Sequence, residues 1–410
     1  MERCAPKLIR WDVNSKCNLT CTHCCVSDNL RDDSIKDLSY EQFDNALRRL
    51  ASSNVEGVHF LGGEPTIRKD FLDLLRIGNE CGLTVSFNTN GIRQDKRYLD
   101  GIFAYNIHKV VVSIDGPDER SHEAIRGANT FHKTVAFVRQ LIALRRERGQ
   151  ECPYVQIQSV LTGTWAHRVH DMVSLCVELG VDGLKVNHLA EFGDASSHLH
   201  SLFPGYSAHF FALLDILDCS IKHPNLRIEA PIKALVYQYH RRHSEVKLAP
   251  DFYNCPAIHD NIYVGPNGDV APCQLAHLQG MGNDLPIGNI VSDEPAALWN
   301  SEYFDLFYRE VQDTDFDALY RNQIPCNRCA FRGIVCNPCP LPSKPGFYPT
   351  NYMCLIAEQL LNVEDETAQQ LSRVRAEQEI TRIVADNPLR SSHRHVIKKM
   401  GWTPPSPPRG

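Results

Sequence analysis

Short apolar runs alternate with amphipathic stretches along the first half of the chain. Six runs rich in β-branched and aromatic residues predict β-strands, at positions 8–13, 57–61, 83–88, 109–115, 155–161 and 183–189. The stretches between them repeat apolar positions with the period of a helix. This alternation of strands and helices predicts a parallel sheet with right-handed crossovers. An open six-unit barrel and a doubly wound sheet both satisfy it.

Two of the predicted helices have recognisable ends. Ser39 and Gln42 form a capping-box pattern at the start of one helix, whose apolar positions are Tyr40, Phe43, Leu47 and Leu50. A later helix is expected at 165–179, with Gly180 as its stop and an apolar stripe of Val169, Val173 and Cys176.

The second half of the chain has a different character. Positions 191–250 are rich in histidine and predict helices at 202–221 and 231–243, whereas positions 251–354 carry Cys, Pro and Gly at close intervals. Such a segment is typical of a small domain organised by metal. We expect four parts: a (β/α)6 core at 1–195, a helical connection at 196–250, a Cys-rich domain at 251–356, and a helical, partly disordered tail at 357–410.

Composition excludes several classes of protein. The 410 residues carry a formal net charge of −6 and a pI of about 6.3, so the chain has no basic field for nucleic acid. No run reaches the roughly 18 consecutive apolar residues of a membrane span, and the first residues do not form a signal peptide. We therefore expect a cytoplasmic protein that binds neither nucleic acid nor membranes. Sixteen cysteines in such a protein indicate metal binding or redox chemistry rather than disulfides.

Three of these cysteines lie on one short loop after the first predicted strand. They are Cys17, Cys21 and Cys24. A structural zinc site usually recruits four protein ligands, so three thiolates do not complete one. They suit a [4Fe–4S] cluster whose fourth iron is open to a small molecule. Alone, the motif also fits three structural cysteines, and the segments that follow decide between these interpretations.

Glycine-rich and polar segments stand at the ends of the next three predicted strands, where parallel α/β folds place their ligand sites. They are Gly62-Gly63-Glu64-Pro65, Asn88-Thr89-Asn90-Gly91 and Ser113-Ile114-Asp115-Gly116, the last followed by Ile125-Arg126-Gly127. Paired glycines let the backbone approach a ligand closely, and a carboxylate can hold an ammonium group. Each segment alone is typical of a turn, but their shared placement indicates one site.

Together with the Cys-x3-Cys-x2-Cys motif, these segments resemble the radical S-adenosylmethionine (radical SAM) family in order and spacing, over positions 8–190. The resemblance implies a partial, TIM-like (β/α)6 barrel that binds a [4Fe–4S] cluster through Cys17, Cys21 and Cys24, with S-adenosylmethionine on the open iron. It further implies cofactor contacts from His23 near the adenine, from Gly62, Gly63 and Glu64 at the methionine ammonium, and from Ser113, Asp115 and Arg126 at the ribose or carboxylate. Cleavage of the cofactor would give a 5′-deoxyadenosyl radical that abstracts hydrogen from a substrate.

The C-terminal half supplies a second cysteine pattern. Cys255, Gly268 and Cys273 are followed by Cys326-x2-Cys329-x6-Cys336-x2-Cys339 and then by Cys354. Paired Cys-x2-Cys units are also zinc-ribbon spacing, so zinc is the alternative. The glycine–cysteine element and the Gly288-Asn289-Ile290 segment favour iron–sulfur. The whole set resembles the C-terminal extension called the SPASM domain, which carries two auxiliary iron–sulfur clusters.

That second resemblance implies two ligand sets. The outer cluster would be held by Cys326, Cys329, Cys336 and Cys354, and the inner cluster by Cys255, Cys273 and Cys339. The quartet spacing differs from the family's usual one, so the division of Cys336 and Cys339 between the clusters stays open. The fourth ligand of the inner cluster also stays open, with His259 and Asp260 nearby.

Peptide maturation is the commonest assignment for this architecture, so hydrogen abstraction from a peptide is the expected function. In the related sulfatase-maturating enzymes an acidic residue follows the second auxiliary cysteine as a base; Gln274 stands there in this chain and cannot take a proton. An enzyme acting on a sugar, nucleoside or tetrapyrrole is the alternative, and a non-catalytic zinc-binding protein is a third hypothesis.

The expected partners follow from the same resemblance. They are S-adenosylmethionine, a low-potential flavodoxin or ferredoxin as electron donor, and a peptide substrate. Because the first predicted strand begins at position 8, we also expect any leader-peptide-binding partner to be a separate protein.

Overall fold

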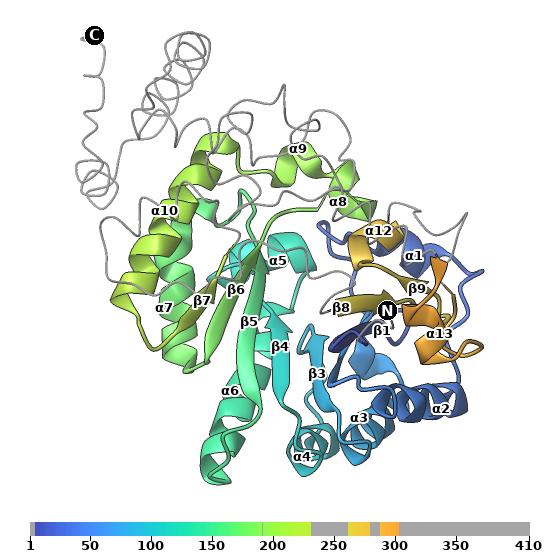
Figure 1. Ribbon diagram of the computed structural model, residues 1–410. Coiled ribbons are helices and arrows are strands. Elements are labelled where there is room, and N and C mark those ends of the chain that lie inside the picture. Colours follow the sequence, from blue (N-terminus) through green and yellow to red (C-terminus); the bar gives the residue numbers. More distant parts are fainter. Residues whose placement is uncertain (1–4, 191, 231–260, 279–287, 303–410) are drawn as a thin grey trace, which may run out of the picture.

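The computed structural model describes residues 5–190, 192–230, 261–278 and 288–302. Within these residues, nine strands form one sheet in the order β7-β6-β5-β4-β3-β2-β1-β8-β9. The sheet curves into an open barrel with helices on its outer side (Figure 1). The strands are β1 (Leu8–Asp12), β2 (Gly57–Leu61), β3 (Thr84–Thr89), β4 (Lys109–Ser113), β5 (Tyr154–Val160), β6 (Gly183–Asn187), β7 (Arg227–Glu229), β8 (Asn261–Val264) and β9 (Val270–Ala271).

The six predicted strands are confirmed, each within one or two residues at its ends. Strands β1 to β7 are parallel and lie in sequence order. A doubly wound sheet reverses its strand order near the middle, so this order excludes that alternative and confirms the partial barrel. In a singly wound sheet all the strands end at the same rim, which places the segments that follow them side by side.

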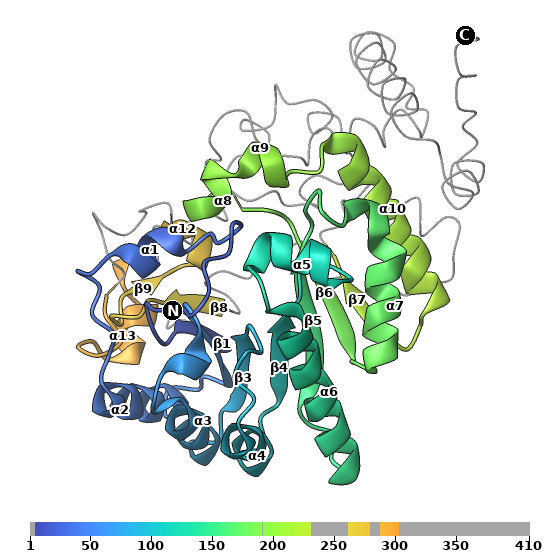
Figure 2. The same cartoon turned by 180° about the vertical axis from the view of Figure 1, so that it is seen from behind.

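Longer helices cover the outside of the sheet, and several of the shorter ones lie over the rim where the parallel strands end (Figures 1 and 2). The outer helices are α2 (Tyr40–Ala51), α3 (Phe71–Glu80), α4 (Lys96–Ala104), α6 (Phe131–Glu147), α7 (Val169–Leu179) and α10 (Tyr206–Lys222). The remaining helices and 3-10 turns are α1 (Ser27–Arg31), η1 (Pro65–Ile67), α5 (Glu119–Arg126), η2 (Ala166–Arg168), α8 (Gly193–Ser197), α9 (Leu199–Leu202), α12 (Gln274–Leu278) and α13 (Pro295–Trp299).

The predicted helix ends are confirmed in detail. Ser39 and Gln42 exchange the two hydrogen bonds of a capping box at the start of α2. Gly180 ends α7 in the left-handed conformation, with φ of 70°. The helix predicted at 165–179 begins instead with the 3-10 turn η2 and becomes an α-helix at Val169.

The core between sheet and helices is apolar and includes a row of aromatic rings. Phe60, Phe71, Phe87 and Tyr98 are buried, and successive ring centroids lie 6.0, 5.4 and 6.3 Å apart, in edge-on contacts. Alternate residues of each strand enter this core. The residues between them must therefore face the inside of the barrel.

That inner face is mainly polar. It carries Arg10, Asp12, His59, Ser86, Asn88, Lys109, Gln156, Gln158, Lys185 and Tyr263. His59 contacts Ser86 Oγ at 2.7 Å and Asn88 Oδ1 at 2.8 Å. Burial lowers the pKa of His59 to about 3, so this imidazole is neutral. A polar lining of this kind suits the binding of a polar molecule rather than simple packing.

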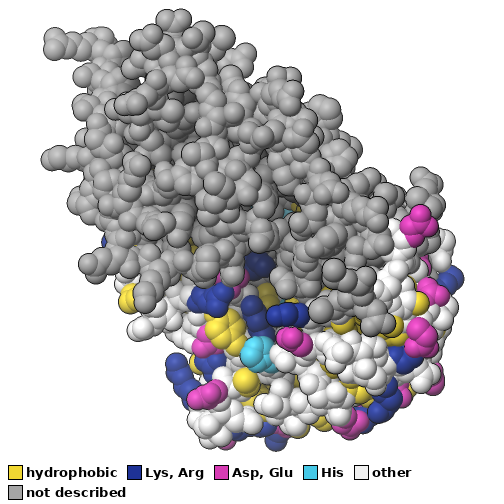
Figure 3. All heavy atoms as spheres, viewed as in Figure 1, with side chains coloured by type: hydrophobic (Ala, Val, Ile, Leu, Met, Phe, Trp, Pro, Cys, Tyr) yellow, Lys and Arg dark blue, Asp and Glu magenta, His cyan; other side chains and the backbone are white. Residues whose placement is uncertain are grey.

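The described surface mixes charges of both signs. In the view of Figure 3, Lys and Arg side chains gather near the middle, next to Asp, Glu and a His. Among the helices that the structure describes, none is long and apolar enough to cross a membrane.

Three short strands escaped the sequence patterns. β7 lies in the segment predicted as a helical connection, and β8 and β9 lie in the predicted Cys-rich domain. Strands of two to four residues show too little alternation to be recognised. β8 pairs in parallel with β1, so part of the C-terminal segment belongs to the barrel sheet. The helix predicted at 231–243 and the tail at 357–410 lie outside the described residues, and the domain limits at 195, 250 and 356 stay predictions.

Candidate functional site

The three motif cysteines lie on the loop between β1 and α1. Cys21 is buried, whereas Cys17 and Cys24 are half-buried, and none of the three forms a disulfide. The loop is shaped by its own backbone: Cys24 N donates to Cys21 O at 3.1 Å, and Leu19 N donates to Cys17 Sγ at 3.4 Å. The loop therefore holds three reduced thiols in one small region.

Electrostatics indicate what this thiol set is suited to bind. Burial, with a smaller contribution from the neighbouring charges, raises the pKa of Cys17 and Cys24 to about 12, and burial also raises that of Cys21. Three thiolates are stable there only against strong positive charge, such as that of iron. Arg126 supplies part of it, since its guanidinium lowers the pKa of Cys21.

The arrangement of possible ligands among the described residues bears on the kind of metal centre. No group of three His, Cys, Asp or Glu side chains among them is arranged to hold a single metal ion. A cubane cluster places each cysteine on a different iron, so its ligands need not converge on one point. The three cysteines of the loop are the kind and number of ligands that such a cluster takes when one iron is left open.

Gly62 and Gly63 bring the end of β2 against this loop. Gly63 N donates to Asn14 O at 3.1 Å, and a Cβ at Gly63 would lie 2.1 Å from Lys16 O. A Cβ at Gly62, where φ is +139°, would lie 2.6 Å from Asn14 Oδ1. The two glycines thus permit close contact between the end of β2 and the cysteine loop. From the sequence alone, we expected them to permit the close approach of a ligand.

Glu64 ties the end of β2 to the end of β3. Its carboxylate is buried and accepts hydrogen bonds from Thr66 N at 3.1 Å, Thr89 Oγ1 at 2.8 Å and Asn90 N at 2.7 Å. Asn90 Nδ2 in turn donates to Asn18 Oδ1 at 2.8 Å, which leads back to the cysteine loop. Sequence reasoning assigned no role to Thr89, Asn90 or Asn18, although it marked the polar run after β3.

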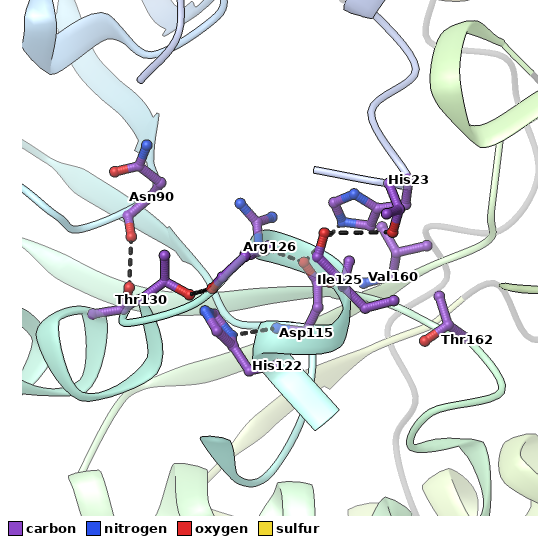
Figure 4. Close-up of polar contacts among 12 residues, drawn as sticks. His23, Asn90, Asp115, His122, Ile125, Arg126, Thr130, Val160 and Thr162 are labelled. Carbon is purple, nitrogen blue, oxygen red and sulfur yellow. Dashed lines mark hydrogen bonds and ion pairs between the residues drawn. The ribbon is translucent and has the colours of Figure 1, made fainter. Parts of the chain in front are cut away.

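Asp115 is the centre of a second buried network (Figure 4). His23 Nε2 lies 2.8 Å from Asp115 Oδ2, Arg126 Nε donates to the same oxygen at 2.5 Å, and Val160 N donates to Oδ1 at 2.7 Å. Asp115 N donates to His122 Nδ1 at 3.2 Å. One carboxylate thereby joins the cysteine loop, α5 and β5.

The charges of this network are mutually stabilised. Burial alone would raise the pKa of Asp115, but Arg126 and His23 outweigh it and hold that pKa well below its usual range. Burial would lower the pKa of Arg126, but Asp115 and the cysteine thiolates raise it. The pair is therefore ionised, and the Arg126 guanidinium and the His23 ring lie on either side of the Asp115 carboxylate (Figure 4).

The remaining predicted residues fall into two groups. Ser113 is buried at the end of β4, beside Asp115 on the same rim. Cys273 lies between β9 and α12, where its Sγ accepts from Ala276 N at 3.3 Å. Outside the described residues lie the other auxiliary ligands and their neighbours, namely Cys255, His259, Asp260, Cys326, Cys329, Cys336, Cys339 and Cys354.

Family models match two parts of the chain. Residues 12–152 match the radical SAM superfamily, and residues 255–330 match the iron-sulfur cluster-binding domain called SPASM. The first range contains the cysteine loop with both buried networks up to Arg126. The second contains Cys255, Cys273, Cys326 and Cys329.

Curated relatives agree with these matches. Mycofactocin maturase MftC of Mycobacterium ulcerans is 33% identical over 139 residues, which are 34% of this chain and 37% of that protein. The chain thus matches little more than a third of that relative. PqqA peptide cyclase of Bradyrhizobium diazoefficiens is 24% identical over 82% of this chain and 81% of that protein. AdoMet-dependent heme synthase of Nitratidesulfovibrio vulgaris is 23% identical over 81% of this chain and 87% of that protein.

A solved structure supports the fold. The crystal structure of SuiB of Streptococcus suis bound to S-adenosylmethionine aligns with a TM-score of 0.60 and 17% identity, over 80% of this chain and 71% of that chain. At this level of identity the likeness concerns the fold alone.

Proposed function

We propose, on the premise that this chain is a radical SAM enzyme with a SPASM iron–sulfur domain, that it modifies a peptide by radical chemistry. One observation carries the proposal. The loop of Cys17, Cys21 and Cys24 is fixed against the ends of three parallel strands by buried polar groups. A radical must be aimed at one hydrogen of its substrate, and such a frame provides the necessary rigidity.

The radical SAM domain binds a [4Fe–4S] cluster with S-adenosylmethionine, which supplies a 5′-deoxyadenosyl radical for hydrogen abstraction. The chain's own residues have supporting parts. The three cysteines would hold the cluster, and the Gly62–Gly63 approach would keep their loop in place. His23, on the cysteine loop itself, and Arg126, on α5, are both held by Asp115 and would face the cofactor. Glu64 would fix the rim beneath it.

Relatives of this chain support a peptide as the substrate. The PqqA peptide cyclase matches over more than four fifths of both chains. SuiB, whose fold is shared, has also been solved with its precursor peptide SuiA. We propose that this chain likewise acts on a peptide, with two auxiliary clusters in the C-terminal domain.

A small-molecule substrate is the second candidate, because the heme synthase matches over a similar share of the chain. The polar inner face of the barrel suits either substrate class.

Two partners and a location complete the proposal. A low-potential flavodoxin or ferredoxin would deliver the electron, and a separate protein would bind a leader peptide. Both, and the enzyme itself, would be cytoplasmic. Affinity capture under anaerobic conditions would detect either partner.

The deciding experiment is an anaerobic assay with deuterated candidates. Reconstituted enzyme is incubated with S-adenosylmethionine, a reductant, and either deuterated synthetic peptides or deuterated small metabolites. We expect deuterium to appear in 5′-deoxyadenosine with a peptide, together with a mass change in that peptide. Deuterium transfer from a small metabolite, with none from any peptide, would overturn the peptide proposal. Zinc without iron or sulfide in the anaerobically purified protein would overturn the enzyme assignment.

A further inference from the structure

Three buried carboxylates stand at the ends of inner strands, and one of them differs from the others. Glu64 and Asp115 use both carboxylate oxygens in hydrogen bonds to protein groups. Asp12 accepts one hydrogen bond, from the Tyr263 hydroxyl to Oδ2 at 2.6 Å. Its other oxygen, Oδ1, is buried and has no hydrogen-bond partner among the residues that the structure describes. A buried carboxylate oxygen left in this state is costly unless a ligand uses it.

Asp12 lies on the inner face of the barrel, at the end of β1. It is the last residue of β1 and shares the inner face with Arg10, whereas Ile9 and Trp11 pack into the outer core. The chain continues from Asp12 directly into the cysteine loop. Tyr263 comes from β8, the neighbour of β1 contributed by the C-terminal half. The carboxylate therefore lies at the junction of the cysteine loop, the barrel interior and the C-terminal segment.

Three titratable groups in the described part of the chain interact with Asp12. They are the Tyr263 phenol from β8, the Arg10 guanidinium from β1 and the Cys25 thiol from the loop after the motif. Burial raises the pKa of Asp12 to about 7, while the Tyr263 hydrogen bond and Arg10 work in the opposite direction. The carboxyl group is thus suited to exchange a proton near neutral pH.

No described neighbour offers a competing base on the C-terminal side. Gln274, at the start of α12, carries an amide that cannot accept a proton. His277, on the same helix, contacts the Tyr263 ring, with centroids 5.0 Å apart, and burial lowers its pKa. Its imidazole therefore packs against the phenol rather than against the open oxygen of Asp12.

We propose that Asp12 is the general base of this enzyme, with Oδ1 taking a proton from the substrate and Tyr263 positioning the carboxylate. The inference rests on the radical chemistry proposed above and adds its proton acceptor. After a hydrogen atom has been removed, the radical carbon forms a bond to a substrate heteroatom whose N–H, O–H or S–H bond breaks. The proton passes to Asp12, which becomes a carboxylic acid. The remaining electron leaves to an oxidised iron–sulfur cluster, the oxidant class that the C-terminal domain supplies.

Two substitutions separate this role from a purely structural one. Asp12→Asn keeps an oxygen that can accept the Tyr263 hydrogen bond but removes the base. Tyr263→Phe keeps the base but removes the hydrogen bond. With the peptide identified by deuterium transfer, Asp12→Asn should lower product formation by about 10²-fold or more, while deuterium transfer to 5′-deoxyadenosine stays within about threefold of wild type. Asp73→Asn, a surface carboxylate on α3, serves as the control and should change neither.

The pH profile tests the positioning part. Because the carboxylate is the active form, product formation should rise with pH through the pKa of Asp12. The Tyr263 hydrogen bond lowers that pKa, so Tyr263→Phe should move the profile to higher pH with a smaller loss at its plateau. An Asp12→Asn variant that forms product at the wild-type rate would overturn the proposal. The proposal would also be overturned if Tyr263→Phe lost as much product formation as Asp12→Asn and kept the wild-type pH profile. A hydrogen bond with a purely structural role would give that result.

A readout without turnover tests Asp12 directly. Infrared difference spectra of the oxidised holoenzyme between about pH 6 and pH 8, with [4-¹³C]aspartate, should show one buried carboxyl group titrating. That signal should be missing from Asp12→Asn. Absence of any such signal in the wild-type enzyme would overturn the proposal. Absence of deuterium transfer from every peptide, in contrast, would count only against the peptide substrate.

Discussion

Replacing Gly63 by Ala tests the contact between the end of β2 and the cysteine loop. The added Cβ would meet three backbone atoms, Lys16 O at 2.1 Å, Lys16 C at 2.4 Å and Cys17 N at 3.0 Å. Backbone atoms of a loop cannot rotate away as a side chain does. The loop must move as a unit, and Cys17 moves with it.

The size of the effect follows from these distances. Ordinary contacts of a Cβ begin at 3.4 Å, so relief of the shortest contact needs a movement of about 1.3 Å, from 3.4 minus 2.1. Overpacking of this kind costs about 1–3 kcal/mol, and a clash with backbone belongs at the upper end. A loss of about 3 kcal/mol lowers the melting temperature by roughly 6–12 °C. A displaced Cys17 should also cost most of the iron at the N-terminal site.

Three measurements detect these effects. They are iron and sulfide content, electron paramagnetic resonance of the reduced cluster with and without S-adenosylmethionine, and thermal melting. Gly82→Ala is the matched control. Gly82 has a φ of +75° and open space around the position of a Cβ, so its substitution strains only the backbone, by about 1 kcal/mol. If Gly63→Ala keeps full N-terminal iron and an unchanged resonance, the close-approach argument is refuted.

Four further predictions concern the same site. Asp115→Asn should lower the free energy of unfolding by about 3–5 kcal/mol, because it leaves the largely enclosed Arg126 guanidinium without its counter-ion. It should also weaken binding of S-adenosylmethionine in a titration, and unchanged melting and binding would contradict the prediction. The pKa of Asp115 lies well below its usual range, so the stability that this group contributes is fully present above its unfolded pKa of about 4. That stability should be lost only when strong acid brings the pH down through the pKa of the folded state. Acid unfolding monitored by circular dichroism checks this expectation. Replacing Cys17, Cys21 and Cys24 together by Ala should abolish cleavage of S-adenosylmethionine while auxiliary iron remains, with Cys81→Ala as the matched control; persistent cleavage would disprove the assignment of the cluster ligands. In the iron-free protein, Cys17 and Cys24 should react slowly with iodoacetamide at about pH 8, because a pKa of about 12 leaves roughly 10⁻⁴ of each thiol ionised. Mass spectrometry measures the alkylation rate, and fast alkylation would contradict the burial argument.

The barrel was predictable from sequence because each strand is a buried run with a clear end. The pattern around Val58 and Phe60, for example, is bounded by Gly57 and by the glycine pair that follows β2. The alternation alone left the winding of the sheet open, since both architectures bury the same residues. Only the pairing of neighbouring strands decided it.

The individual roles of the predicted site residues stay predictions. Glu64 and Asp115 were expected at the cofactor, and the structure adds that their carboxylates accept hydrogen bonds from protein donors on other elements. A sequence cannot show such donors, because the partners stand 11 to 92 positions apart along the chain. Asp12 was overlooked because an acidic residue at the end of an apolar strand is usually exposed, and its partner Tyr263 lies 251 positions away.

The pairing of β8 with β1 also imposes an order of events during synthesis. β1 ends at Asp12 and β8 begins at Asn261, so 249 residues (261 − 12) must be made before β1 gains its second neighbour. At about 5–20 residues per second, the edge of β1 stays without that neighbour on the ribosome for roughly 12–50 s. An open strand edge of this kind readily pairs with another chain. The same delay leaves Asp12 without the Tyr263 hydroxyl, so the nascent barrel is open on this side while the chain is still being made.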